Sequence, residues 1–121
     1  MKFSVNSLEM LDDHVEKKTP GWIGVDLDGT TAKYEGWKGW NHIGDPIPQM
    51  IDRIKKWRKA GFTVKILTAR CSKVSLGRNK LMFSQMEKVI QDWTEKHIGE
   101  RLPVTSEKDC WMLFSVDDSI I

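Results

Sequence analysis

The chain has 121 residues, of which 40% are hydrophobic and 30% charged, with a formal net charge of +2. This length fits a single domain over residues 1–121, and the mild charge does not by itself favour nucleic-acid binding. No apolar run approaches the roughly 20 residues that cross a bilayer, and the N-terminus lacks the apolar core of a signal peptide, so we expect a cytoplasmic protein without membrane contact.

The first part of the chain predicts a helix, a buried strand and a long loop. Residues 1–20 have apolar positions at helical spacing and end in a Pro-Gly pair, so we expect an N-terminal helical extension. Residues 22–27 (WIGVDL) form a nearly continuous apolar run, which predicts a buried strand. Residues 29–45 are rich in glycine and tryptophan. We expect an irregular flap loop there.

The rest of the chain alternates between predicted helices and strands. Residues 46–61 have helical apolar spacing, and Gly61 stands where a left-handed cap is typical. Residues 79–99 predict a second, longer helix. Its apolar face is expected to contain Leu81, Met82, Met86, Val89, Ile90 and Trp93. Short apolar runs predict three further strands, at residues 62–68, 102–106 and 111–116.

The order of these elements predicts an α/β fold. Alternating strands and helices imply crossovers that cover the faces of a mostly parallel sheet, so we expect a Rossmann-like three-layer sandwich. Ligands of such sheets bind beyond the carboxyl ends of the strands. Three of the predicted strands end in Asp26, Thr68 and Asp117. The sequence therefore predicts a polar site at that edge.

Four short motifs resemble the haloacid dehalogenase-like (HAD) hydrolase superfamily. They are DLDGT (26–30), ILTAR (66–70), SEKD (106–109) and SVDD (115–118), in the order found in that superfamily. The resemblance extends over most of the chain and implies an HAD-like core. Only 39 residues separate Asp28 from Thr68, too few for an additional cap domain of about 50 residues. The chain thus looks like a small capless phosphatase-like member of the phage or prophage type.

The resemblance implies a nucleophile and a metal site among the acidic residues. Asp26 would attack a phosphoryl group and form an aspartyl-phosphate, and Asp28 would serve as general acid and base. Two neighbouring carboxylates at a buried strand end are tolerable when a divalent cation lies between them. Mg²⁺ would be bound by Asp26, the backbone carbonyl of Asp28, and a carboxylate from Asp117 or Asp118.

The remaining motif residues are expected to hold the phosphoryl group. Thr68 would bind a phosphoryl oxygen, and Lys108 would supply positive charge opposite the metal. Gly29 would allow a sharp turn whose backbone N–H groups face the phosphate. Arg70 could steady the phosphate or form a structural ion pair, and both alternatives stay open. The neighbouring Cys71 is expected to be an inert thiol.

The aromatic side chains of the flap loop also leave two readings open. Tyr34, Trp37 and Trp40 could stack on a base or sugar ring of a ligand. They could equally anchor the loop to its own domain.

The fourth predicted strand is followed by few residues, so we expect it at an exposed edge of the sheet. An apolar edge is a liability unless it is covered. The N-terminal helix or a second copy of the chain could cover it, which makes a homodimer a possible assembly.

These residues together predict an Mg²⁺-dependent phosphomonoesterase. Its substrate would be a small phosphorylated molecule or a phosphorylated nucleic-acid end. The alternative is a phosphate- or nucleotide-binding module that is related to phosphatases but turns substrate over poorly.

Overall fold

A computed structural model describes residues 21–72 and 79–117 of the chain. Its elements are β1 (Trp22–Asp26), α2 (Pro48–Lys59), β2 (Thr63–Leu67), the 3-10 turn η1 (Ala69–Cys71), α4 (Lys80–Ile98), β3 (Val104–Thr105) and β4 (Met112–Val116). These bounds confirm the predicted helices and strands from residue 22 onward. The expected helical extension over residues 1–20 lies outside the described residues, as does Asp118.

The strands form one four-stranded sheet in the order β3-β2-β1-β4, and every pairing is parallel. The central strand β1 pairs with β2 on one side and β4 on the other, so its residues are enclosed by two ladders, as its apolar run predicts. Near the carboxyl end of β1, Val25 pairs with Ile66 and with Val116. In the described sheet β4 lies at an edge, as expected, whereas the predicted homodimer across that edge stays a prediction.

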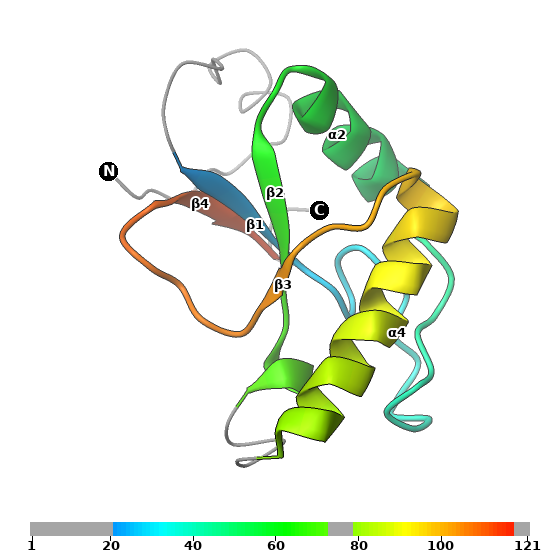
Figure 1. Ribbon diagram of the computed structural model, residues 1–121. Helices are drawn as coiled ribbons and strands as arrows, with labels where there is room; N and C mark the ends of the chain where they lie inside the picture. Colours follow the sequence, from blue (N-terminus) through cyan, green and yellow to red (C-terminus); the bar gives the residue numbers. More distant parts are fainter. Residues whose placement is uncertain (1–20, 73–78, 118–121) are drawn as a thin grey trace.

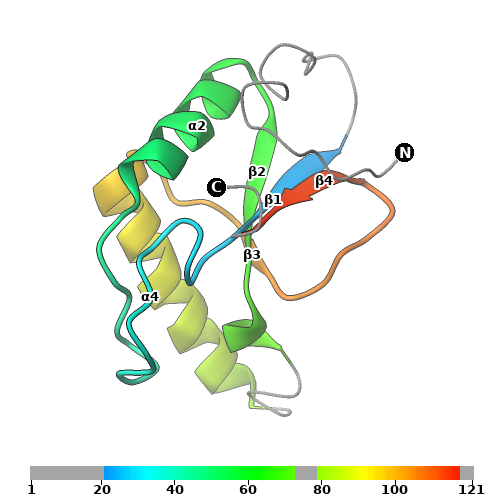
Figure 2. The same cartoon turned by 180° about the vertical axis from the view of Figure 1, so that it is seen from behind.

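Helices α2 and α4 pack against the same face of this sheet and against each other (Figure 1, Figure 2). Burying a Val, Leu or Ile side chain stabilises a fold by roughly 1.5–3 kcal/mol. The side chains that the sheet and the helices bury between them include Ile23, Val25, Val64, Ile66, Met50, Ile54, Trp57, Met86 and Ile90. The three-layer expectation is met in part, because the described residues form the sheet and one helical layer.

The two helices begin and end much as the sequence indicates. The Asn79 side chain accepts a hydrogen bond from the Met82 backbone N–H at 3.0 Å, which caps the start of α4. Gly99 ends this helix in the left-handed conformation, with φ 102°. Gly61 follows α2 with φ 97°, as predicted.

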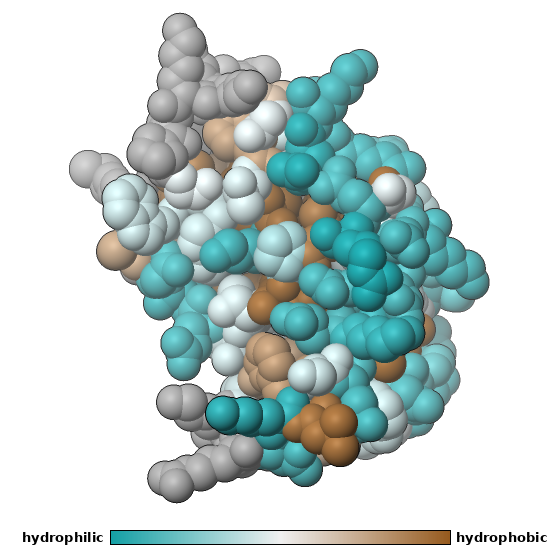
Figure 3. All heavy atoms as spheres, in the orientation of Figure 1, coloured by the Kyte–Doolittle hydropathy of each residue, from teal (hydrophilic) through white to brown (hydrophobic). Residues whose placement is uncertain are grey.

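One part of the predicted apolar face of α4 is wrong. Leu81 is 68% exposed, because the first turn of α4 extends beyond the sheet that buries the later turns. Figure 3 shows this apolar patch at the start of α4, beside the mostly hydrophilic outer side of the two helices. No helix among the described residues is long and apolar enough to cross a bilayer.

The connection from β3 to β4 is a short loop, residues 106–111, which links the two edge strands of the sheet (Figure 1). Asp109 in this loop accepts a hydrogen bond from the Trp22 indole N–H at 2.8 Å. The Lys65 ammonium lies 4.6 Å from the centroid of the same indole ring, a cation–π contact. The face of β1 away from the helices is thereby tied to this loop.

Candidate functional site

The carboxyl ends of the strands bring the predicted acidic residues to one edge of the sheet. Val25 and Val116 are partners in the β1–β4 ladder, so Asp26 and Asp117 follow in the same register on strands roughly 4.8 Å apart. Side chains alternate along a strand. Asp26 and Asp117 therefore belong to the face opposite the core residues Val25 and Val116.

This edge is also the point where the direction of the chain connections reverses. From β1 the chain proceeds through α2 to β2 on one side, whereas β4 lies on the other side of β1. In parallel α/β sheets, ligands bind in the crevice at such a switch point, outside the carboxyl ends of the strands. Asp26 is the last residue of β1, and Asp117 directly follows β4. The topology thus gives the candidate site its position.

A tight turn follows β1 and holds the residues after Asp26. Gly29 has φ 85°, a conformation that glycine adopts without steric cost, which confirms the predicted turn. The Gly29 N–H donates to the carbonyl of Ala32 at 2.7 Å, and the Leu27 carbonyl accepts from the N–H of Ala32 at 2.9 Å. The Thr31 hydroxyl donates to the Asp26 carbonyl at 2.6 Å. The Gly29 amide is thus used inside the turn, not turned outward as expected for binding a phosphate.

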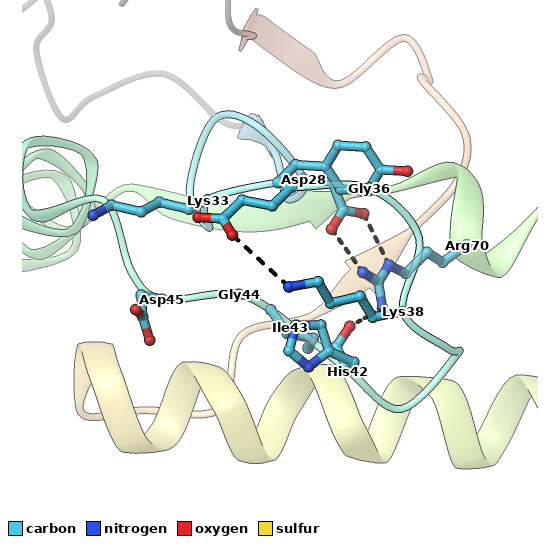
Figure 4. Close-up of a pocket in the computed structure, with 11 residues that line it drawn as sticks. Asp28, Lys33, Gly36, Lys38, His42, Ile43, Gly44, Asp45 and Arg70 are labelled. Atoms are coloured by element: carbon cyan, nitrogen blue, oxygen red, sulfur yellow. Dashed lines mark hydrogen bonds and ion pairs between the residues drawn. The ribbon is translucent and has the colours of Figure 1, made fainter.

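Arg70 forms a two-pronged ion pair with Asp28 (Figure 4). Its Nε and Nη2 donate to the two carboxylate oxygens of Asp28 at 2.8 and 2.7 Å. Its Nη1 donates to the backbone carbonyls of Trp40 and His42 at 3.3 and 2.8 Å. The Arg70 side chain is 6% exposed and that of Asp28 24%. Of the two roles left open for Arg70, the structure therefore contains the ion pair.

Thr68 and Lys108 occupy very different surroundings. Thr68 follows β2, is buried, and its hydroxyl accepts a hydrogen bond from the Arg70 backbone N–H at 3.2 Å. Its own N–H donates to the Thr105 carbonyl at 2.9 Å, which fixes it beside the end of β3. Lys108 is exposed, in the loop that leaves the same edge after β3. Thr68 is thus held at the site edge, and the position of the Lys108 ammonium stays a prediction.

Cys71 is a buried thiol next to this region. Burial, with a smaller effect of the Glu87 charge, raises the pKa of Cys71 from 9.0 to about 11, although Arg70 opposes the shift. The thiol is therefore protonated at neutral pH, and thiols react as thiolates. This agrees with the expected inert role.

A cavity of about 150 Å³ lies between the flap loop and the Asp28–Arg70 ion pair (Figure 4). Besides those two residues, its walls come from residues 33–45 of the flap loop, with Lys33, Lys38 and His42 among them. The predicted site residues Asp26, Thr68, Lys108 and Asp117 do not line it. The cavity therefore adjoins the acidic edge and shares Asp28 with the proposed chemistry.

Of the flap-loop residues that line this cavity, only Tyr34 was singled out from the sequence. Lys33 and Lys38 flank Tyr34 and Trp37 along the chain, and this closeness of cations and aromatic rings is the signal that could have pointed to them. His42 also lines the cavity, and its backbone carbonyl accepts a hydrogen bond from Arg70.

The oxygen donors at the sheet edge fit Mg²⁺ in type. No group of three or more His, Cys, Asp or Glu side chains suited to a metal occurs within residues 21–72 and 79–117. Mg²⁺ commonly takes one or two protein carboxylates and completes its shell with water and substrate phosphate. Asp26 and Asp117 lie in register on neighbouring strands, so their carboxylates and a backbone carbonyl are the groups that would supply this smaller set of ligands. Asp118 lies outside the part that the structure describes.

Comparison with known protein families and with curated proteins finds no match for this chain. The fold is nevertheless defined as α/β with an all-parallel sheet. The position of the site follows from that topology, and its chemistry from the residues at the switch point.

Proposed function

We propose that the chain is an Mg²⁺-dependent phosphomonoesterase with an HAD-like core and no cap domain. The observation that carries the proposal is the register of β1 and β4, because it makes Asp26 and Asp117 neighbours at the switch point of the sheet. The order of motifs along the chain supports the same conclusion.

In this proposal Asp26 is the nucleophile. One of its carboxylate oxygens bonds to the phosphorus while the ester P–O bond breaks, and the leaving oxygen takes a proton from the acid form of Asp28. A water molecule then attacks the phosphorus of the aspartyl-phosphate and gives a proton back to Asp28. The bond between the Asp26 oxygen and the phosphorus breaks in this step, so inorganic phosphate leaves and Asp26 is restored. Mg²⁺, held by Asp26, Asp117 and the Asp28 carbonyl, would neutralise charge on the phosphoryl group.

The ion pair with Arg70 sets a condition on this mechanism. Both carboxylate oxygens of Asp28 accept hydrogen bonds from Arg70. Each oxygen keeps a second lone pair, but a proton on Asp28 removes the negative charge that pairs with Arg70, so protonation of Asp28 weakens this ion pair. Arg70 is then a positioning residue, and its ion pair holds Asp28 until a phosphoryl group arrives.

The same ion pair favours a second candidate, a binding module with little turnover. In such a protein Asp28 and Arg70 would remain paired and serve only to hold the flap loop, whose carbonyls Arg70 also binds. This candidate predicts Mg²⁺-dependent binding of phosphomonoesters without release of inorganic phosphate.

Phosphate release from a panel of phosphomonoesters tests the proposal and separates the two candidates. The full chain should release phosphate in Mg²⁺ and not in excess EDTA, and Asp26→Asn should abolish release without unfolding the protein. Asp52→Asn, which changes an exposed carboxylate on α2, is the matched control and should keep full activity. Activity that survives in Asp26→Asn would refute the proposed nucleophile, and binding without release would favour the binding module.

A further inference from the structure

Several hydrogen bonds that do not involve its aromatic rings hold the flap loop in place. The Lys33 N–H donates to the Asp45 carbonyl at 2.8 Å, which joins the two ends of the loop. The Trp93 indole N–H, on α4, donates to the Gly44 carbonyl at 3.1 Å and ties the loop to that helix. Arg70 binds two further carbonyls near its middle. None of these hydrogen bonds involves an aromatic ring of the flap loop.

Two of these rings remain largely in solvent beside the cavity. Tyr34 is 51% exposed and lines the cavity, and Trp37 is 59% exposed between two lining residues. By contrast, Trp57 is 3% exposed in the core. Large rings left in solvent on a loop beside a polar cavity are typical of surfaces that bind another molecule.

Trp37 contacts a residue of the proposed site. The guanidinium carbon of Arg70 lies 5.0 Å from the centroid of the Trp37 ring, a cation–π contact. The same guanidinium forms the ion pair with Asp28. A ring held in this way is a pre-oriented platform, because the contact fixes one side while more than half of the side chain stays accessible.

The cavity itself offers a cation to a phosphate. In Figure 4 the Lys38 side chain lies below Asp28, and its ammonium points away from Arg70, along a dashed line to another carboxylate. Its partner is Glu35 at 3.8 Å, and the two side chains are 53% and 75% exposed. Such an exposed pair contributes little and can exchange for a phosphate oxygen.

The cavity is large enough for only one part of a nucleotide-sized ligand. At about 150 Å³ it is well below the roughly 300–1,000 Å³ of pockets that enclose a whole small molecule. It takes a phosphate or a sugar ring and leaves any attached base outside, at the rim where Trp37 and Tyr34 are exposed.

From these contacts we infer that the flap loop binds a nucleobase of the substrate, which Trp37 and Tyr34 stack against while Lys38 contacts its phosphate. This rests on the proposed function and names the substrate class of the same site: a phosphomonoester attached to a nucleoside. The nucleoside can belong to a free nucleotide or to the end of a single-stranded nucleic acid. Stacking on aromatic side chains tolerates any base.

Equilibrium binding of two ligands that differ by the base tests the inference. Thymidine 5′-monophosphate carries a base and ribose 5-phosphate does not. We expect the full chain, with Asp26→Asn to prevent turnover, to bind the nucleotide roughly 5- to 150-fold more tightly, the range that one stacked base supplies. The same comparison on the unsubstituted chain without added Mg²⁺ excludes an effect of the substitution.

Substitution of the platform should remove this preference. Trp37→Ala should bring the two dissociation constants within about twofold, and Trp37→Phe should retain most of the difference. Trp111→Ala is the matched control, because Trp111 is also 59% exposed but precedes β4, at the opposite end of that strand from the site. The variant Trp111→Ala should keep the same difference in affinity between the nucleotide and ribose 5-phosphate as the chain with Trp111.

Binding of 5′-phosphorylated tetrathymidylate shows whether the base belongs to a free nucleotide or to the end of a nucleic acid. Binding at least tenfold tighter than the mononucleotide assigns the surface to nucleic-acid ends, and equal binding assigns it to free nucleotides. Equal affinity of the parent chain for nucleotide and ribose 5-phosphate, or no nucleotide binding at all, would overturn the inference whatever the folding of the variants. Failure of the phosphatase proposal would show instead as absent phosphate release.

Discussion

Removal of the Arg70 side chain should destabilise the protein more than removal of any exposed arginine. Breaking a buried ion pair from one side costs about 3–5 kcal/mol, because the remaining charge loses its partner. The Asp28 side chain is 24% exposed, so water solvates part of that charge and we reduce the figure to about 2 kcal/mol. Loss of the hydrogen bonds to the carbonyls of Trp40 and His42 adds about 1 kcal/mol. We expect Arg70→Ala to lower the free energy of unfolding by about 3 kcal/mol.

Urea and thermal denaturation measure this loss, and the melting temperature should fall by about 10 °C for a domain of this size. Arg58→Ala is the matched control: Arg58 binds Glu100 at 2.6 Å and the Phe62 carbonyl at 2.7 Å, but its side chain is 35% exposed. Its loss should cost no more than about 1 kcal/mol. If Arg70→Ala proves no more destabilising than Arg58→Ala, the ion pair does not anchor the flap loop and the reasoning is refuted.

Three further predictions concern the core, the flap loop and the thiols. Met86→Ala should cost about 2–5 kcal/mol in urea denaturation, since Met86 is 2% exposed, and a loss below 1 kcal/mol would contradict the assigned core. Gly44→Ala should cost about 2 kcal/mol, because the added Cβ would collide with a backbone carbonyl oxygen across the flap loop; an unchanged melting temperature would argue against this loop geometry. Iodoacetamide at pH 8 should modify exposed Cys110 and spare buried Cys71, so mass spectrometry that finds two adducts on the folded protein would count against the raised thiol pKa.

The Cys71 thiol also makes stability depend on pH. Its pKa is raised from 9.0 to about 11 in the folded protein. The unfolded chain therefore loses its thiol proton first, and the contribution of Cys71 is fully present below pH 9.0 and lost as the pH rises through about 11. Cys71→Ser should weaken this alkaline decline.

The sequence was sufficient for the elements that local pattern determines. The apolar run of β1, the helical spacing of α2 and the glycine that follows α2 each reflect a local conformational preference, and all three appear where they were predicted. Leu81 was misplaced because periodicity defines the face of a helix but does not say how far the sheet beneath it extends. The predicted three-layer sandwich was met only in part for a similar reason, because the path of the chain after β3 depends on tertiary contacts.

The candidate site divides in the same way. Residues at strand ends, such as Asp26 and Thr68, could be assigned from position, because parallel strands place their carboxyl ends together. The ion pair between Asp28 and Arg70 joins residues 42 apart in the chain, and nothing local distinguishes it from a phosphate contact. The role of Trp37 likewise depends on where the flap loop folds, which only the structure defines.

Magnesium-dependent melting tests the central claim, that Asp26 and Asp117 form one cation site, most directly. Mg²⁺ at about 100 times its Kd should raise the stability of the full chain by about 2.7 kcal/mol. We predict that Asp26→Asn and Asp117→Asn each abolish the increase in melting temperature, whereas Asp52→Asn retains it. A melting temperature that does not respond to Mg²⁺ at any concentration, or a response that persists in either site variant, would contradict the account.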